Sequence, residues 1–97
     1  MKEAEFENYL MTDASITSKT KALRSRITKA RAIEKHFEQS LDNIVSCDNS
    51  MYQTLLRIKA EMKDTNGTVS NALRKYYIFV NGKQFPSLVD YEKTKGD

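Results

Sequence analysis

The chain has 97 residues, of which 39% are hydrophobic and 30% charged, so it fits one domain and is too apolar for a disordered chain and too polar for a membrane protein. One cysteine cannot form an internal disulfide, and one cysteine with one histidine excludes the usual zinc clusters, which favours a reducing cytoplasm and a protein without metal or cofactor. The net charge of +3 is unevenly spread, because residues 18–35 hold seven basic residues against Glu34 alone, and such a segment attracts polyanions.

Four amphipathic segments predict four main helices, at about residues 2–11, 18–39, 48–63 and 68–80. In each, apolar residues recur in steps of three and four, which is the period of one helix face. The predicted core-facing residues are Phe6, Tyr9, Leu10, Leu23, Ile27, Ala30, Ile33 or Glu34, Phe37, Met51, Leu55, Ile58, Met62, Val69, Leu73, Tyr76 and Val80. Short connections and a single proline add to this pattern, and together they predict a compact all-α domain.

The connections carry residues typical of turns and helix ends. Residues 40–46 are predicted to form a short turn that closes one end of the core with three apolar residues: Leu41, Ile44 and Val45. Asp48 or Ser50 is expected to cap the third helix, and Asn66-Gly67 is expected to end it. Asn81-Gly82 is expected to end the fourth helix in the same way.

The last part of the chain is predicted to be an attachment rather than core. Phe85-Pro86 is expected to pin the chain back onto the bundle, and Tyr91 to Asp97 is expected to be solvated. We therefore predict a single helical DNA-binding domain over residues 1–88 and a flexible C-terminal tail or linker over residues 89–97.

The second predicted helix carries a polar stripe roughly 130° around the helix from its apolar face. Five residues at spacings of three and four form it: Lys21, Arg24, Thr28, Arg31 and Lys35. The stripe is about 21 Å long, enough to follow a duplex backbone over about six base pairs. Arginine binds phosphate or guanine edges bidentately, and Ser18 and Thr20 near the helix start can add neutral phosphate contacts. A solvated helix face is the alternative explanation of the same stripe.

The sequence contains no pattern that would support catalysis or nucleotide binding. The three glycines stand apart, so no phosphate-binding loop is present. His36 has no nucleophile nearby, and Cys47 is interpreted as a small filler or an inert thiol. These observations favour a binding module over an enzyme, without a small-molecule substrate.

A particular order of motifs runs through most of the chain. Phe6, Tyr9 and Leu10 are followed by Ser18-x-Thr20, then by His36-Phe37 with Leu41 and Ile44, and then by Asp48, Tyr52 and Leu56. The fourth segment reads Ala72-Leu73-Arg74-Lys75-Tyr76-Tyr77-Ile78-Phe79, with Gly82 and Phe85-Pro86 after it. This order resembles the N-terminal SAM-like, or core-binding, domain of phage integrases and other tyrosine recombinases. Those domains end in a helix of the form Ala-Leu-Arg-x-Tyr-x-x-Phe, with a later glycine and proline.

The resemblance implies a four-helix orthogonal bundle that grips double-stranded DNA through its second and fourth helices. Carried over to this chain, the helices that face DNA bear Lys19, Thr20, Arg24, Arg31, Asn71, Arg74 and Lys75. The family's catalytic domain, with its Arg, His and nucleophilic Tyr residues, is not in this chain. The resemblance therefore implies the non-catalytic part of a protein of DNA integration or recombination. The chain is then either a domain of a longer parent chain, with a catalytic domain C-terminal to it, or a free-standing small protein.

A second hypothesis stays open at this point. The chain is then a helical protein-interaction module that uses its basic face, or its fourth predicted helix, to bind an acidic partner or a second copy of itself. Light scattering with and without duplex DNA separates the two hypotheses, because a stable oligomer that is indifferent to DNA favours the second.

Overall fold

The computed structural model describes residues 1–12, 19–64 and 67–95, and these residues form helices without any strand. The helices are α1 (Glu3–Thr12), α2 (Lys19–Phe37), α3 (Leu41–Val45), α4 (Asp48–Glu61), α5 (Thr68–Asn81) and α6 (Leu88–Lys95). The predicted all-α class is confirmed, and the four predicted helices coincide with α1, α2, α4 and α5. Two helices were not predicted: α3 lies in the expected turn, and α6 lies in the expected tail.

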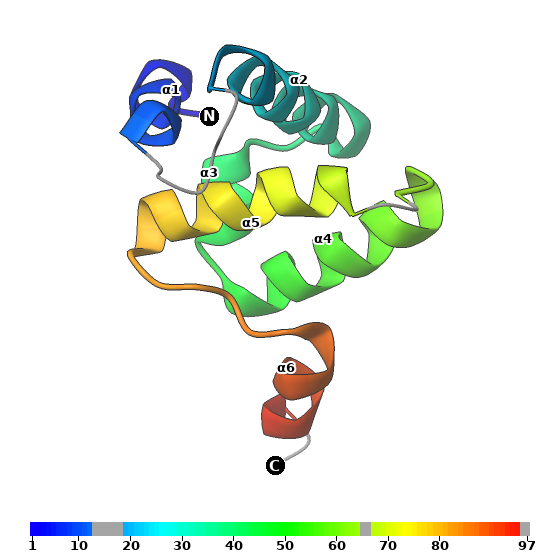
Figure 1. The fold of residues 1–97 in the computed structure, drawn as a ribbon. Helices are drawn as coiled ribbons and strands as arrows, with labels where there is room; N and C mark the ends of the chain where they lie inside the picture. The colour runs from blue at the N-terminus through cyan, green and yellow to red at the C-terminus, as the bar shows by residue number, and fades with distance from the viewer. Residues whose placement is uncertain (13–18, 65–66, 96–97) are drawn as a thin grey trace.

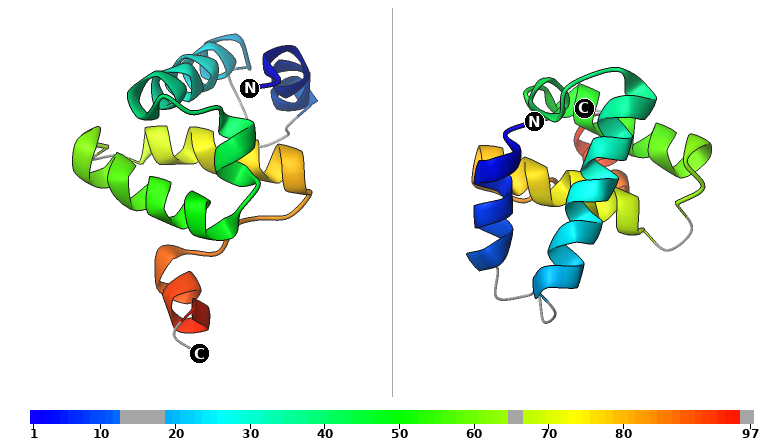
Figure 2. Two further views of the ribbon diagram at one scale, coloured as in Figure 1. Left: turned by 180° about the vertical axis from the view of Figure 1, so that it is seen from behind. Right: turned by 90° about the horizontal axis from the view of Figure 1, so that it is seen from above.

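Helix α5 lies at the centre of the molecule and contacts α1, α2, α3 and α4. Figure 1 shows α1 and α2 together on one side of α5, with α4 on the other side, and Figure 2 shows the same arrangement from behind and from above. Helix α6 projects from the bundle beyond α4. None of the described helices combines the length and the apolar composition that crossing a bilayer requires.

The core is built largely from the predicted apolar stripes. Ile27, Ala30 and Ile33 of α2 are buried, and so are most of the predicted residues of α1 and α4. The stripe of α5 differs from the prediction at one position, because Val80 is 41% exposed and Tyr77 is only 2% exposed. The buried Tyr77 hydroxyl donates a hydrogen bond to the Asp48 carboxylate at 2.7 Å, which offsets the cost of burying a phenol.

In the last turn of α5, Phe79 takes the packing role that was expected of Val80. Its ring lies 5.6 Å from the ring of Phe6 and 5.4 Å from that of Tyr9, both on α1. The larger aromatic side chain reaches across to α1, and the shorter Val80 is left at the surface.

Some helix ends differ from those predicted from the local sequence. The residue that caps α4 is Cys47, which makes no side-chain capping bond, so the predicted cap at Asp48 or Ser50 is wrong. Helix α4 ends at Glu61, and Gly67, with φ of 75°, begins α5 instead of ending α4. At the other end of α5, the prediction is confirmed: Gly82 has φ of 73° and donates its N–H to the Ile78 carbonyl.

A buried carboxylate takes over the capping of α5. Asp64 accepts hydrogen bonds from the backbone N–H groups of Val69 and Ser70, at 3.0 and 2.9 Å, and from the Ser70 hydroxyl at 2.7 Å. Burial opposes the charge on Asp64, but the bonds from Ser70 and Val69 outweigh it and lower the pKa of this carboxyl. Asp64 therefore satisfies two of the unpaired donors in the first turn of α5.

A polar network holds the start of the chain against the bundle. The Met1 ammonium lies 2.9 Å from a Glu34 carboxylate oxygen and 3.4 Å from one of Asp42. Tyr76 donates its hydroxyl to Asp42 and accepts the backbone N–H of Lys2. Burial raises the pKa of Tyr76, while for Met1 the bond to Glu34 and the nearby carboxylates outweigh burial and raise the pKa of its ammonium.

Aromatic side chains attach α6 to the bundle. Phe85 is buried against Tyr77, with ring centroids 5.2 Å apart, which confirms the predicted pinning of this segment. Tyr91 stacks on Tyr52 at 4.9 Å, and the Tyr52 hydroxyl donates to Glu92. The expectation that the chain is solvated from Tyr91 onward is therefore wrong for Tyr91 itself, which is half-buried in this cluster.

Candidate nucleic-acid interface

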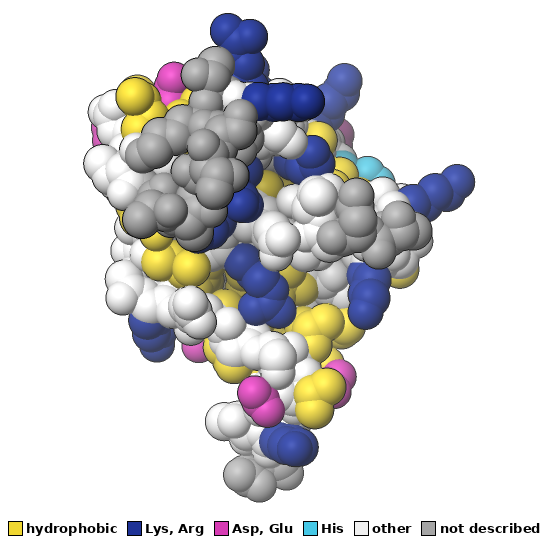
Figure 3. Space-filling model, in the orientation of Figure 1, with side chains coloured by type: hydrophobic (Ala, Val, Ile, Leu, Met, Phe, Trp, Pro, Cys, Tyr) yellow, Lys and Arg dark blue, Asp and Glu magenta, His cyan; other side chains and the backbone are white. Residues whose placement is uncertain are grey.

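Basic side chains gather on one face of the molecule. In Figure 3, several Lys and Arg side chains lie over α2 and α5 among hydrophobic and uncharged side chains, while Asp and Glu appear mainly near the edges of this face and around α6. The positive charge that the sequence concentrates in residues 18–35 is therefore joined by charge from α5, a helix far away in the chain.

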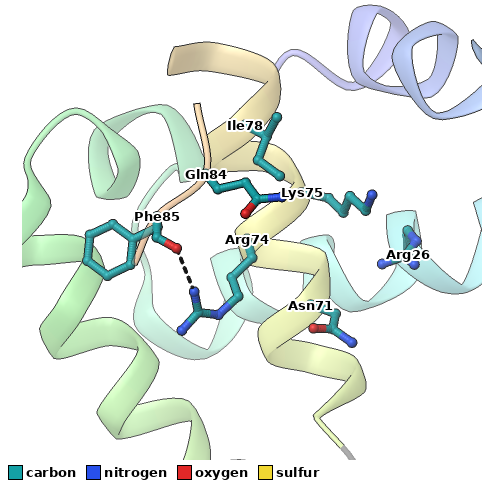
Figure 4. Close-up of a pocket in the computed structure, with 7 residues that line it drawn as sticks. All are labelled: Arg26, Asn71, Arg74, Lys75, Ile78, Gln84 and Phe85. Atoms are coloured by element: carbon teal, nitrogen blue, oxygen red, sulfur yellow. Dashed lines mark hydrogen bonds between the residues drawn. The ribbon is translucent and has the colours of Figure 1, made fainter. Parts of the chain in front are cut away.

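Two adjoining hollows lie between α2 and α5. The larger, of about 330 Å³, is lined by Arg26 from α2, by α5 residues and by the segment after α5, as Figure 4 shows. Its lining residues are Arg26, Asn71, Arg74, Lys75, Ile78, Gln84 and Phe85. The smaller, of about 130 Å³, is lined by Ser25, Arg26, Lys29, Thr68 and Asn71. Arg26 and Asn71 line both hollows, and no carboxylate from the described part of the chain lines either one.

Arg26 and Lys29 are the α2 residues that this site adds to the predicted set. The buried Nε of Arg26 has no hydrogen-bond partner among the described residues. The Lys29 ammonium donates to the Ser25 hydroxyl at 2.6 Å, which holds it at the edge of the smaller hollow. A sequence signal for Arg26 does exist, because it lies seven residues before Ile33 and therefore on the same helix face. A cation in the register of an apolar stripe points toward a neighbouring helix, not toward open solvent.

The three predicted residues of α5 lie together, but they are not equivalent. Asn71 is exposed, and Lys75 extends toward Arg26 across the larger hollow (Figure 4). Arg74 points the other way: its Nη1 donates to the carbonyls of Phe85 and Pro86, each at 3.1 Å.

Arg74 therefore holds the segment that follows α5. Its guanidinium also lies 5.9 Å from the centre of the Phe85 ring. Burial lowers the pKa of this guanidinium, which remains far above neutral pH. Its expected role as a groove contact is thus secondary to a structural one, because its hydrogen bonds to two carbonyls fix its position.

The predicted stripe of α2 faces a different neighbour. Arg24, Thr28 and Arg31 line a third hollow, of about 340 Å³, together with Glu3 and Glu7 of α1. Arg31 forms a two-pronged pair with Glu3, at 2.6 and 2.5 Å. The bond from Arg31 lowers the pKa of the Glu3 carboxyl, and the same bond raises the pKa of Arg31.

In the structure, the predicted stripe of α2 and the predicted residues of α5 therefore do not line one common hollow. Arg24 and Arg31 do not line either hollow between α2 and α5, so the expectation that they join Arg74 in one site is not met. Lys21 and Lys35 are exposed, and the side chains of Lys19 and Thr20, like Ser18, lie outside the part of the chain that the structure describes.

His36 and Cys47 lie at the surface, away from the hollows between α2 and α5. His36 lies 3.0 Å from Glu61, which also pairs with Arg57. Cys47 is exposed. Among the described residues, no three His, Cys, Asp or Glu side chains gather as metal ligands would.

Comparison of the chain with models of known protein families, with curated proteins and with solved structures found no match. The interpretation of the site therefore depends on its own geometry and charge.

Proposed function

We propose that this chain binds double-stranded DNA through the face formed by α2 and α5, without catalysing a reaction itself. The observation that carries the proposal is the pair of adjoining hollows, lined by four cations and by no described carboxylate. A concave surface of one sign of charge concentrates a polyanion and speeds its encounter. Phosphate contacts of this kind supply most of the affinity that does not depend on DNA sequence.

The other lining residues support nucleic acid over a simple anion. Asn71 and Gln84 carry amides that both donate and accept hydrogen bonds, as contacts to base edges require. Ser25 and Thr68 carry hydroxyls of the kind that contact phosphates. Helix α2 has 19 residues and is about 28 Å long, so a duplex lying along it has room for several backbone contacts.

The resemblance to the core-binding domains of phage integrases and tyrosine recombinases extends the proposal. Helices α2 and α5 correspond to the second and fourth predicted helices, which are the ones expected to face DNA. On this basis we propose that the helices form a SAM-like orthogonal bundle. We further propose that the chain acts in DNA integration or recombination beside a separate catalytic domain of a longer parent chain.

The test compares two pairs of substitutions that remove the same charge from opposite sides of α2. Fluorescence anisotropy of a labelled duplex at low salt gives the affinity of the unmodified chain, of Arg26→Gln with Lys29→Gln, and of Arg24→Gln with Arg31→Gln. The first pair removes cations from the α2–α5 hollows, and the second removes cations that lie beside Glu3 and Glu7. We expect the first pair to weaken binding much more than the second.

Two results would contradict the proposal. If the unmodified chain does not bind duplex DNA at low salt, DNA is excluded as its ligand. Equal affinity of the unmodified chain and the Arg26 and Lys29 variant would remove the α2–α5 face as the site. Light scattering on the same samples tests the protein-interaction hypothesis, since a stable oligomer that ignores duplex DNA would replace the proposal with that alternative.

A further inference from the structure

We infer that the smaller hollow between α2 and α5 is a seat for one phosphate group, with Arg26 as its main donor. This inference rests on the proposed function where the phosphate belongs to a DNA backbone. The hollow, of about 130 Å³, has room for a tetrahedral oxyanion, since a water molecule occupies about 30 Å³.

The unpaired donor of Arg26 is the first argument for a ligand. Its Nε is buried and has no hydrogen-bond partner among the described residues. A buried N–H without an acceptor is unfavourable, so a small rotation of the guanidinium that turns Nε–H toward an acceptor in the hollow would gain a bond without breaking one inside the protein. Because Arg26 lines both hollows, the same guanidinium can hold a phosphate in one and face the larger hollow as well.

The neighbours of Arg26 favour an anion over water. Lys29 is held at the rim by the Ser25 hydroxyl, and Thr68 and Asn71 supply a hydroxyl and an amide from α5. Two cations and three neutral polar groups suit an acceptor with several oxygens, and arginine matches a phosphate with two parallel hydrogen bonds.

The beginning of α5 adds a weaker contribution. The hollow lies beside the N-terminal turn of this 14-residue helix, where the helix dipole favours negative charge. The N–H groups of Val69 and Ser70 are already taken by Asp64, so the side chains must supply the donors.

The test follows the Nε–Hε resonances of the arginines by ¹H–¹⁵N NMR on the whole chain. Inorganic phosphate and an unrelated duplex are titrated in separate arms. We expect both to shift the Arg26 resonance in a saturable way and to leave that of Arg57 in place, because Arg57 is already paired with Glu61. Arg26→Lys keeps the charge but removes Nε–H, and it should weaken phosphate binding about tenfold, the usual effect of losing a bond to a charged group. Arg57→Lys is the matched control.

The two arms separate this inference from the proposed function. A shift of Arg26 with free phosphate but no binding of the duplex supports the seat and contradicts the DNA proposal. A shift with the duplex alone supports a seat that takes a backbone phosphate only. Duplex binding that leaves the Arg26 resonance in place overturns the seat while the DNA proposal stands, and a chain that responds to neither ligand overturns both.

Discussion

The slope of log affinity for duplex DNA against log salt concentration should reflect the number of cations on the α2–α5 face that contact phosphates. Three cations other than Arg74 line the two hollows: Arg26, Lys29 and Lys75. Arg74 is left out because it is bonded to the carbonyls of Phe85 and Pro86. With about 0.9 counterions released per phosphate, three contacts predict a slope of about −2.7 for log affinity against log salt.

The substitution of Arg26 and Lys29 by glutamine should flatten this slope. Loss of two contacts leaves a slope of about −0.9. Between about 50 and 200 mM salt, the affinity of the unmodified chain should then fall about 40-fold, and that of the double variant only about 3-fold. Anisotropy titrations of one labelled duplex at several salt concentrations measure both slopes.

The matched control is the variant with Arg24→Gln and Arg31→Gln. Neither arginine lines the α2–α5 hollows, and Arg31 is paired with Glu3, so their loss should leave the slope at about −2.7. If this control flattens the slope more than the Arg26 and Lys29 variant does, the outer stripe of α2 is the DNA surface and the reasoning from the hollows is wrong.

Three other predictions concern charges elsewhere in the fold. Glu3→Gln should remove a negative charge that opposes the field of α2 and so strengthen duplex binding without steepening the slope in the same titration, whereas Glu5→Gln, which is outside the α1–α2 hollow, should strengthen it less. Asp64→Ala should lower the free energy of unfolding by about 1–2 kcal/mol in urea melts because it removes the cap of α5, and an unchanged midpoint would show that the cap is dispensable. Folding raises the pKa of the Met1 ammonium, so the charged ammonium stabilises the fold fully below about pH 8, and this stabilisation is lost as the pH rises through the pKa of the folded state. Urea melts at about pH 7 and about pH 9.5 should therefore give a lower free energy of unfolding at the higher pH. Equal free energies at the two pH values would contradict this prediction.

Helix positions could be predicted from the sequence because the apolar period is a local property. Ile27, Ala30 and Leu73 are buried where the stripes place them. The ends of the helices were less predictable, since distant partners decide them. Asp48 has the chemistry of a cap, yet it accepts the hydroxyl of Tyr77 from α5 instead.

The binding site could be predicted only in part. The charge of α2 follows from the sequence and the involvement of α5 from the resemblance to the integrase domains, and Asn71 and Lys75 of the predicted set line the larger hollow. Which cations of α2 face α5 depends on how the helices pack, and the spacing of the basic residues within α2 does not determine this. The packing instead brings Arg26, in register with the core, to the hollow.

The value of a cation for binding therefore depends on the charge that folding places beside it. Residues 3–7 hold three glutamates and precede the basic segment in the chain, and α1 packs directly against α2. Because Glu3 and Glu7 lie beside Arg24 and Arg31, the acidic helix weakens the positive field on that side of α2 and leaves it stronger on the α5 side. A polyanion approaching α2 is then attracted more strongly to Arg26 and Lys29 than to Arg24 and Arg31, although all four residues carry the same formal charge.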